Sequence, residues 1–273
     1  MKILPPMRFL PMLALFLTGF SYAQVSVIGE LSQDRDTQPG ESYSGTIMIK
    51  NDSNEPQEAK IYQTDYLFFS NGTNSYGEPG SHPRSNAPWV TFSPSFVTIP
   101  PQSTVTVNYT VIIPPNTTER TLIGSYWSML MVEGIPKGSP ESSGARDKKA
   151  EMGIMQMIRY GIQIASHIAN TGTCKIEFKN PKLVANDKGG SVFQIDIENI
   201  GDLGIRPDVY LELFDEKGVS QGKFPGIRYR IYPGTSVRES IDVSAAPKGK
   251  YKALVVVDAG GDDIFGAQYD LQF

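Results

Sequence analysis

Few side chains in this 273-residue chain have the types and spacing that metal binding or catalysis requires. The two histidines, His82 and His167, match neither a zinc-ligand spacing nor the order of a serine-hydrolase triad. A carboxylate cluster at residues 258–263 would suit calcium, but it lacks the repeated ligand spacing of a calcium loop and is better explained as a hairpin turn. The sequence therefore predicts no metal site, no cofactor and no catalytic residues, and we expect a protein that is not an enzyme.

The chemistry that the residues do favour is main-chain pairing along a β-strand. Residues 153–168 alternate strictly, as β-branched and aromatic residues do in a strand. A polar run at residues 137–151 precedes them, so we expect the last strand of a first domain, preceded by a loop. The strand would either be an ordinary interior strand or have an edge that another chain can use. The parity of interest carries Ile154, Gln156, Ile158 and Tyr160.

The elements that position this strand are further short strands. The chain has 20 Pro and 26 Gly, which favour a turn-rich, all-β chain. In the first half, strands are expected at residues 25–31, 43–51, 58–69, 89–99, 104–113 and 121–133. In the second half they are expected at residues 174–184, 191–199, 207–214, 226–232, 236–243, 251–258 and 265–273.

This regular spacing predicts two immunoglobulin-like Greek-key β-sandwiches in tandem. We place the first domain at residues 24–170 and the second at 174–273, because a short Asn-Thr-Gly-Thr link lies between them. One large barrel is the alternative. A Gly-, Ser-, Asn- and Pro-rich loop at residues 70–88 is long enough to be either functional or mobile.

The N-terminus has the features of a secretory signal peptide, predicted at residues 1–23. Lys2 and Arg8 form its basic region, a short apolar stretch follows, and Ala23 ends a small-residue cleavage site. Removal of these two cations makes a chain of formal charge −4 more acidic, so nucleic acid is not an expected partner. The single cysteine, Cys174, cannot form an internal disulfide and is expected to be a small buried residue. We expect a periplasmic protein that is not embedded in the membrane.

Four blocks of the first half resemble the N-terminal domain of PapD-like periplasmic pilus (fimbrial) chaperones. They are Pro39-Gly40 with a strand ending at Asn51, residues 92–103 with their marked prolines, the run ending at Ile135-Pro136, and Ile162-Gln163-Ile164. The resemblance covers most of residues 24–170, whereas the second half is similar to the family only in its architecture.

The resemblance implies that the last strand of the first domain is lent to the unfinished sheet of a pilus or surface-assembly subunit. The lent side chains would be Ile154, Ile158 and Tyr160, with Gln156 between them. An outer-membrane usher would be a further partner in such an assembly.

The resemblance also implies an Arg and a Lys that hold the carboxylate at the subunit's chain terminus. Arg35 falls at the Arg position, counted back from Gly40, and Gln163 falls where the Lys should be. Gln163 has no charge, so Arg159, on the same parity of the strand, is included as a compensating cation.

Two other functions are compatible with the residues. The chain could be a structural or adhesive envelope protein of tandem immunoglobulin-like domains without chaperone activity, in which the loop at residues 70–88 would matter most. It could also bind carbohydrate through Trp89, Trp127 and the tyrosines, although aromatic residues in such strands more often belong to the core.

Overall fold

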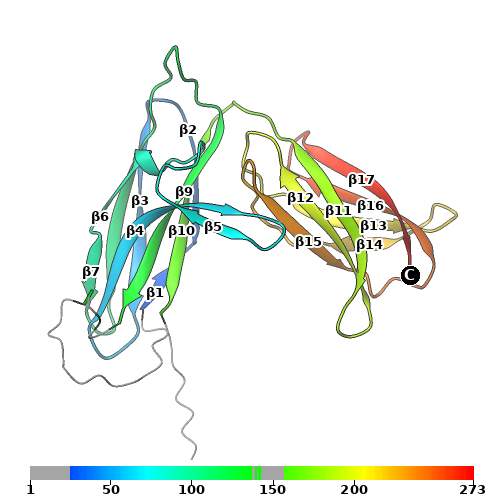
Figure 1. Cartoon of the computed structure of the whole chain (residues 1–273), viewed down its shortest axis with the longest axis horizontal. Helices are drawn as coiled ribbons and strands as arrows, with labels where there is room; N and C mark the ends of the chain where they lie inside the picture. The colour runs from blue at the N-terminus through cyan, green and yellow to red at the C-terminus, as the bar shows by residue number, and fades with distance from the viewer. Residues whose placement is uncertain (1–24, 137–138, 140, 143–156) are drawn as a thin grey trace, which may run out of the picture.

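The computed structural model describes residues 25–136, 139, 141–142 and 157–273, so the predicted signal peptide and the predicted donor residues Ile154 and Gln156 lie outside the described residues. Within that part of the chain, every regular element is a strand except the one-turn helix η1 (Ala87–Trp89). The strands build two β-sandwiches in tandem, which confirms the predicted fold class (Figure 1). No helix among the described residues is long and apolar enough to cross a membrane.

The first sandwich consists of two facing sheets. One has the order β1-β3-β8-β6, from β1 (Val25–Ile28), β3 (Ser42–Asn51), β8 (Thr104–Ile112) and β6 (Val90–Ser93). The other has the order β2-β10-β9-β4-β5, from β2 (Ser32–Thr37), β10 (Arg159–Ile168), β9 (Gly124–Ile135), β4 (Gln57–Phe68) and β5 (Asn74–Gly77), and β7 (Phe96–Ile99) also pairs with β4. Alternate apolar residues of both sheets fill the space between them, among them Ile49, Val107, Leu130 and Ile162.

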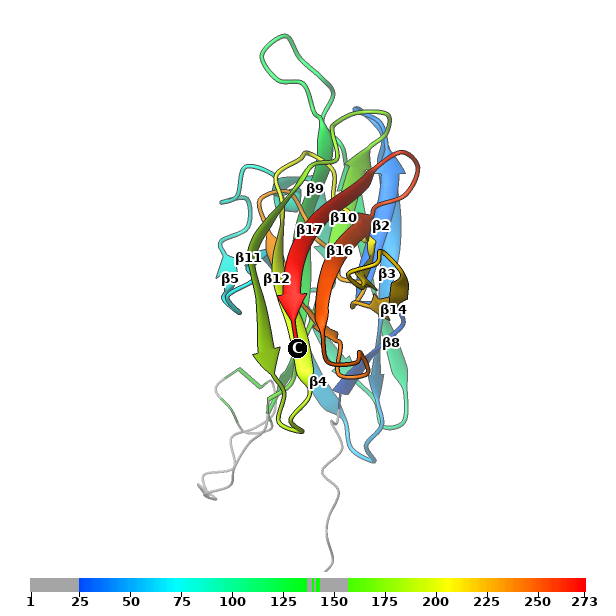
Figure 2. The same ribbon diagram turned by 90° about the vertical axis from the view of Figure 1, so that its right-hand side faces the viewer.

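The second sandwich is built in the same way from a three-stranded and a four-stranded sheet. The smaller sheet has the order β11-β12-β15, from β11 (Ile176–Ala185), β12 (Ser191–Asn199) and β15 (Ser236–Asp242). The larger has the order β14-β13-β16-β17, from β14 (Ser220–Pro225), β13 (Asp208–Phe214), β16 (Lys250–Asp258) and β17 (Ile264–Gln272). Figure 2 looks at this sandwich with β11 and β17 toward the viewer.

Two of the predicted strands are wrong in a way that matters for the site. The single strand expected at residues 25–31 ends at Ile28, and after Gly29, whose φ is +102°, the chain crosses to the opposite sheet as β2. β2 has the polar sequence SQDRDT and no apolar alternation. Main-chain hydrogen bonds to β10, and not side-chain burial, keep it in the sheet. Residues 226–232 also form no strand; β14 lies just before them.

The long loop at residues 70–88 is ordered by one buried carboxylate. Asp65 of β4 is 3% exposed and accepts hydrogen bonds from the backbone N–H groups of Gly80 and His82 and from the hydroxyl of Ser85. Beyond this knot, Asn86 donates to the carbonyl oxygen of Ile164 in β10 at 3.0 Å. The loop is therefore a fixed part of the first sandwich.

Candidate functional site

Strand β10 is paired on both sides over only part of its length. It pairs with β9 from Arg159 to Ile168, but with β2 only from Gln163 onward. Along residues 159–162, none of the described strands occupies the β2 side. Within the described part of the chain, residues 159–162 are therefore an open edge of the sheet, which starts two residues after the described chain resumes at Met157.

The backbone direction of the open edge follows from its neighbours. Gln163 donates its N–H to the carbonyl oxygen of Leu31 at 2.9 Å, so that N–H group points to the β2 side. Because successive N–H groups of a strand point to opposite sides, those of Gly161 and Arg159 also face the open edge. Those of Tyr160 and Ile162 face β9.

The parity that was predicted to be lent faces the interior of the first sandwich. Ile162 and Ile164 are fully buried in its core, and Tyr160 packs against that core while partly exposed. Ile158, at the end of the series, is half-buried. On this parity, Ile158 and Tyr160 are therefore partly exposed, whereas Ile162 and Ile164 are fully buried.

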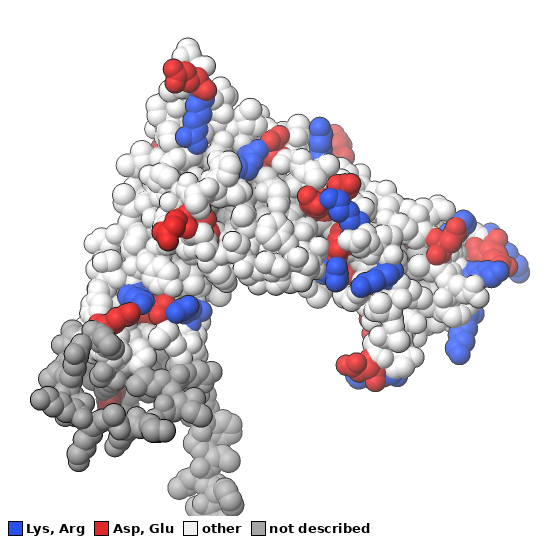
Figure 3. Space-filling model, viewed as in Figure 1, with Lys and Arg blue, Asp and Glu red and all other residues white. Residues whose placement is uncertain are grey.

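The opposite parity of β10 faces a cleft between the two sandwiches. The cleft has a volume of about 880 Å³. The space-filling view shows the molecule hollowed between its two arms (Figure 3). The first wall of the cleft is the outer face of the β10-β9-β4-β5 sheet, with Tyr62, Tyr66, Tyr76, Met129, Met131 and Gln163. Its second wall comes from loops of the second sandwich, with Arg206, Arg228, Tyr229 and Arg230.

Two aromatic rings join the sandwiches behind this cleft. Tyr232 stacks on Trp127 of β9, and its hydroxyl donates to Oε1 of Gln163 at 3.2 Å. Phe68 meets the edge of Tyr232 with ring centroids 6.4 Å apart. Burial raises the pKa of Tyr232 above its ordinary range, so its hydroxyl remains a hydrogen-bond donor.

A chain of polar contacts lies at the same junction. Asp34 of β2 binds Arg230, and its Oδ1 lies 3.3 Å from Nε2 of His167. Nδ1 of His167 lies 2.7 Å from Oγ of Ser125, which in turn accepts the N–H of Gly204 at 2.7 Å. Burial acts to raise the pKa of Asp34, but the hydrogen bonds from His167 and Arg230 outweigh it and hold that pKa below its usual value.

These contacts include a serine, a histidine and an aspartate, but they do not form a nucleophile. Ser125 is fully buried, and its oxygen already accepts a backbone hydrogen bond. The imidazole therefore joins Asp34 and Ser125, each of which contacts the second sandwich, and the hydroxyl beside it is buried. Among the described residues, no group of three or more His, Cys, Asp and Glu side chains could hold a metal ion.

The residues predicted to anchor a carboxylate do not form one cluster. Arg35 pairs in register with Ser166, a residue of the core-facing parity, whereas Gln163 faces the cleft. Arg35 therefore lies on the other face of the sheet, with its guanidinium 5.8 Å from the ring centroid of Tyr43. The two predicted anchor residues thus lie on opposite faces of the sheet, because strand parity reverses the face at each step and the loop length between Gly40 and β2 does not fix it.

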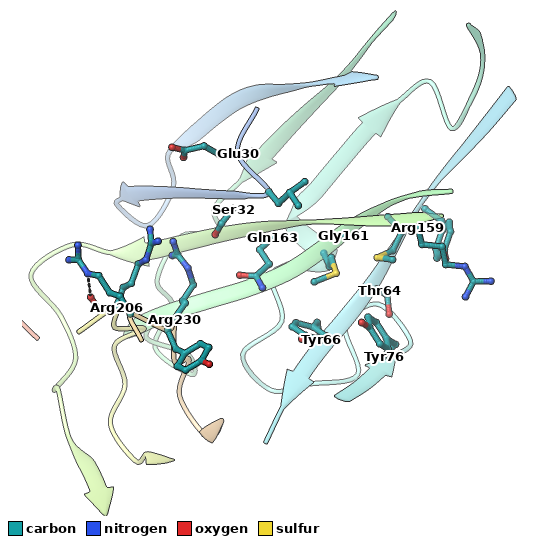
Figure 4. Close-up of a pocket in the computed structure, with 16 residues that line it drawn as sticks. Glu30, Ser32, Thr64, Tyr66, Tyr76, Arg159, Gly161, Gln163, Arg206 and Arg230 are labelled. Carbon is teal, nitrogen blue, oxygen red and sulfur yellow. Dashed lines mark hydrogen bonds between the residues drawn. The ribbon is translucent and has the colours of Figure 1, made fainter. Parts of the chain in front are cut away.

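Gln163 and Arg159 do line the cleft together (Figure 4). The charge of Arg159 is already matched, because its Nε lies 2.7 Å from Oε2 of Glu133, a side chain that is 4% exposed. Hydrogen bonds and charge from Lys60, Tyr62 and Arg159 hold the pKa of Glu133 below its usual value, although burial acts to raise it.

The cations that sequence reasoning missed belong to the second sandwich. Figure 4 shows Arg206 and Arg230 on one side of Gln163 and Arg159 on the other. Arg228 lies 3.2 Å from Asp208 and donates to the carbonyl oxygen of Arg206 at 3.1 Å. No periodic pattern marked these arginines, since they lie in segments outside the strands.

Comparisons with known proteins give similarity in structure only. No family model matches the chain, and no curated protein matches it. A structure titled as a chaperone–tip adhesin complex of CFA/I fimbriae biogenesis is 14% identical, with a TM-score of 0.48, and the match covers 90% of this chain and 98% of that one.

Two further structures show the same degree of similarity. The CsuC–CsuE chaperone–tip subunit pre-assembly complex of Acinetobacter baumannii is 12% identical, with a TM-score of 0.45 and coverage of 89% and 98%. The E. coli chaperone DraB is 15% identical, with a TM-score of 0.42 and coverage of 89% and 95%. All three are chaperones or complexes that contain one, and at these identities the likeness concerns the fold.

Proposed function

We propose that this protein is a chaperone-like binding protein that captures subunits of a pilus or surface assembly by pairing with them along the open edge of β10. The observation that carries the proposal is that, among the strands that the structure describes, only β9 pairs with residues 159–162. A strand added there would receive hydrogen bonds from the N–H groups of Arg159 and Gly161. Main-chain pairing of this kind gives affinity, and the alternating side chains give specificity.

The side chains available for that specificity continue the core-facing parity. Ile158 is half-buried and Tyr160 is partly exposed, so both retain apolar surface that a partner can cover. Ile154 and Gln156, further along the predicted donor series, lie outside the described residues and stay a prediction. Burial of one such aliphatic side chain contributes about 1.5–3 kcal/mol, enough to decide whether a subunit is retained.

A carboxylate of the partner would be met in the cleft by Gln163. Its Oε1 accepts from Tyr232, whereas Nε2 has no hydrogen-bond partner among the described residues and can donate. Arg159 forms an ion pair with Glu133, so its charge is largely neutralised before a partner binds. Arg35 is not included, because it lies on the other face of the sheet.

The cellular setting rests on the sequence. The predicted signal peptide supports a periplasmic location, and the proposed partners are a protein subunit and an outer-membrane usher. We propose that the protein acts by binding and catalyses no reaction. In support, Ser125, which contacts His167 and through it Asp34, is buried.

Capture of a subunit from the periplasm tests the proposal. The chain and its candidate subunit are co-expressed and co-purified, and Ile158→Asp is expected to abolish recovery, because a carboxylate cannot enter an apolar groove. Thr106→Asp, on the exposed face of β8, is the matched control and should retain the partner.

Recovery of the same partner by Ile158→Asp would exclude β10 as the binding element. The envelope-protein alternative would then stand, and it has its own prediction. Deletion within residues 70–88 should impair binding in that case, while Ile158→Asp should not.

A further inference from the structure

One buried acid has no role in the site described so far. Strand β15 directs Val237, Glu239 and Ile241 into the core of the second sandwich, so a carboxyl group occupies a position where an apolar residue is expected. Glu239 is 1% exposed. Its Oε2 accepts the N–H of Ile227 at 2.9 Å, while Oε1 is buried without a hydrogen-bond partner among the described residues.

Ile227, whose N–H Glu239 accepts, directly precedes the residues of the second cleft wall. Residues 226–230, here called the cleft segment, contribute Arg228, Tyr229 and Arg230 to that wall. The segment follows β14 directly and pairs with none of the described strands. Its first residue is fixed by a hydrogen bond from the N–H of Gly226 to the carbonyl oxygen of Val209 at 2.8 Å. The carboxyl of Glu239 supplies the next attachment along the chain.

Gly226 shows how closely the carboxyl and the segment fit. A Cβ atom at this position would lie 2.8 Å from Oε2 of Glu239 and 3.2 Å from Cβ of Val209. Any other residue would therefore displace the carboxyl or the segment. The close approach means that a change in the carboxyl is transmitted directly to the backbone that carries the cleft arginines.

None of the described residues places a counter-charge beside Glu239. The charged residues on the elements around it bind elsewhere: Asp196 of β12 pairs with Arg238, Glu198 of β12 with Lys179, Glu212 of β13 with Lys223, Asp208 with Arg228, and Arg230 with Asp34. Burial raises the pKa of Glu239 to about 7, and the N–H of Ile227 lowers it only in part. An ionised carboxylate with one hydrogen bond in an apolar core is unfavourable.

We propose that Glu239 is a positioning residue for the cleft: its uncharged carboxyl holds the cleft segment against the second sandwich, and its ionisation releases the segment. Subunit binding would then weaken as the pH rises, an extension that rests on the proposed function. The positioning itself needs no partner and can be measured on the protein alone.

The test follows Ile227 by NMR on the purified chain between pH 5.5 and 8.5. The amide of Ile227 is expected to titrate with a midpoint near 7, together with the carboxyl carbon of Glu239. Between the ordinary glutamate pKa and this midpoint, the protection of Ile227 against hydrogen exchange should fall by up to about tenfold per pH unit, because the released segment binds one proton fewer over that range. Above the midpoint the protection should level off. Glu239→Gln keeps an acceptor for Ile227 and should remove the titration while preserving protection.

Two control variants separate this effect from others. Glu216→Gln changes an exposed acid between β13 and β14 and should leave the titration of Ile227 as in the unmodified chain. His167→Gln removes the other group that can move Arg230, through Asp34, and should also leave Ile227 unchanged.

Two results would overturn the proposal: a titration of Ile227 that persists in Glu239→Gln, or a carboxyl carbon of Glu239 that titrates near the ordinary glutamate range. The second needs no variant, so it decides the matter even if Glu239→Gln fails to fold. Neither result bears on strand capture by β10, and a failed capture experiment leaves this titration untouched.

Discussion

Tyr232 of the second sandwich stacks on Trp127 of the first with their ring centroids 4.5 Å apart and their planes within 5° of parallel. Both side chains are buried, Trp127 at 2% exposure and Tyr232 at 0%. The nitrogen of the indole donates to the carbonyl oxygen of Tyr66 at 2.8 Å, which fixes the ring on the β4–β9 pair. The stacked pair therefore holds one wall of the cleft at a set distance from the other.

Removal of the stacked ring should loosen the molecule at the junction. We expect Tyr232→Ala to lower the free energy of unfolding by about 3–5 kcal/mol, as truncation of a buried aromatic residue does. Tyr232→Phe keeps the stacking and loses only the hydrogen bond to Gln163, so it should cost about 1 kcal/mol. Urea denaturation measures both, and equal losses would show that the ring contributes little.

Amide exchange should distinguish the two sides of β10. In the free protein, the N–H groups of Arg159 and Gly161 face the open edge and should exchange quickly, whereas those of Tyr160 and Ile162 bind β9 and should be protected. A captured subunit should protect all four. Hydrogen-exchange NMR measures this, and fast exchange of Arg159 and Gly161 in the complex would contradict strand addition.

The Asp34 contacts should make stability depend on pH in the acidic range. The pKa of Asp34 is lower in the folded chain than in the unfolded one, so its stabilisation is present above the unfolded value, near 4, and is lost as the pH falls through the folded value. Asp34→Asn should therefore be less stable by about 1 kcal/mol at pH 7.

The same comparison at pH 3 should show a much smaller difference between the two proteins, measured by urea denaturation. A difference that is unchanged from pH 7 to pH 3 would mean that Asp34 acts through packing and not through charge. Asp36→Asn, an exposed neighbour on β2, is the matched control.

Gly161 should be sensitive to any added side chain. A Cβ atom there would lie 2.3 Å from Sδ of Met129, so this thioether must move in Gly161→Ala. Overpacking of this kind typically costs about 1–3 kcal/mol, and the flexibility of methionine places the expected loss near the lower limit. Thermal unfolding of the double variant with Met129→Ala should show recovery, and a purely additive loss would exclude the steric cause.

Much of the fold follows from local pattern. Residues 121–133 are apolar on both parities and predicted a central strand, and β9 (Gly124–Ile135) is indeed buried over nearly all its length between β10 and β4. The strict alternation of residues 104–113 likewise gave β8 with one buried face. Burial against a core leaves a signature in side-chain periodicity, and such strands are readable from sequence alone.

A strand that is kept in its sheet by main-chain hydrogen bonds alone shows no periodicity of apolar side chains in its sequence. β2 can be polar because β10 supplies hydrogen bonds to its backbone. Its parity places Asp34 toward Arg230 of the second sandwich and Arg35 on the opposite face. Counting residues from a turn could not establish that, since one residue more or less in the turn exchanges the two faces.

The sequence by itself determined that this chain is a tandem pair of β-sandwiches with a long alternating strand at the end of the first, because burial dictates residue type position by position. Only the tertiary structure decided which part of that strand is left unpaired and which cations face it. Arg206 and Arg230 reach the cleft from loops of the other sandwich, and proximity between distant segments depends on how two domains pack, which no local pattern records.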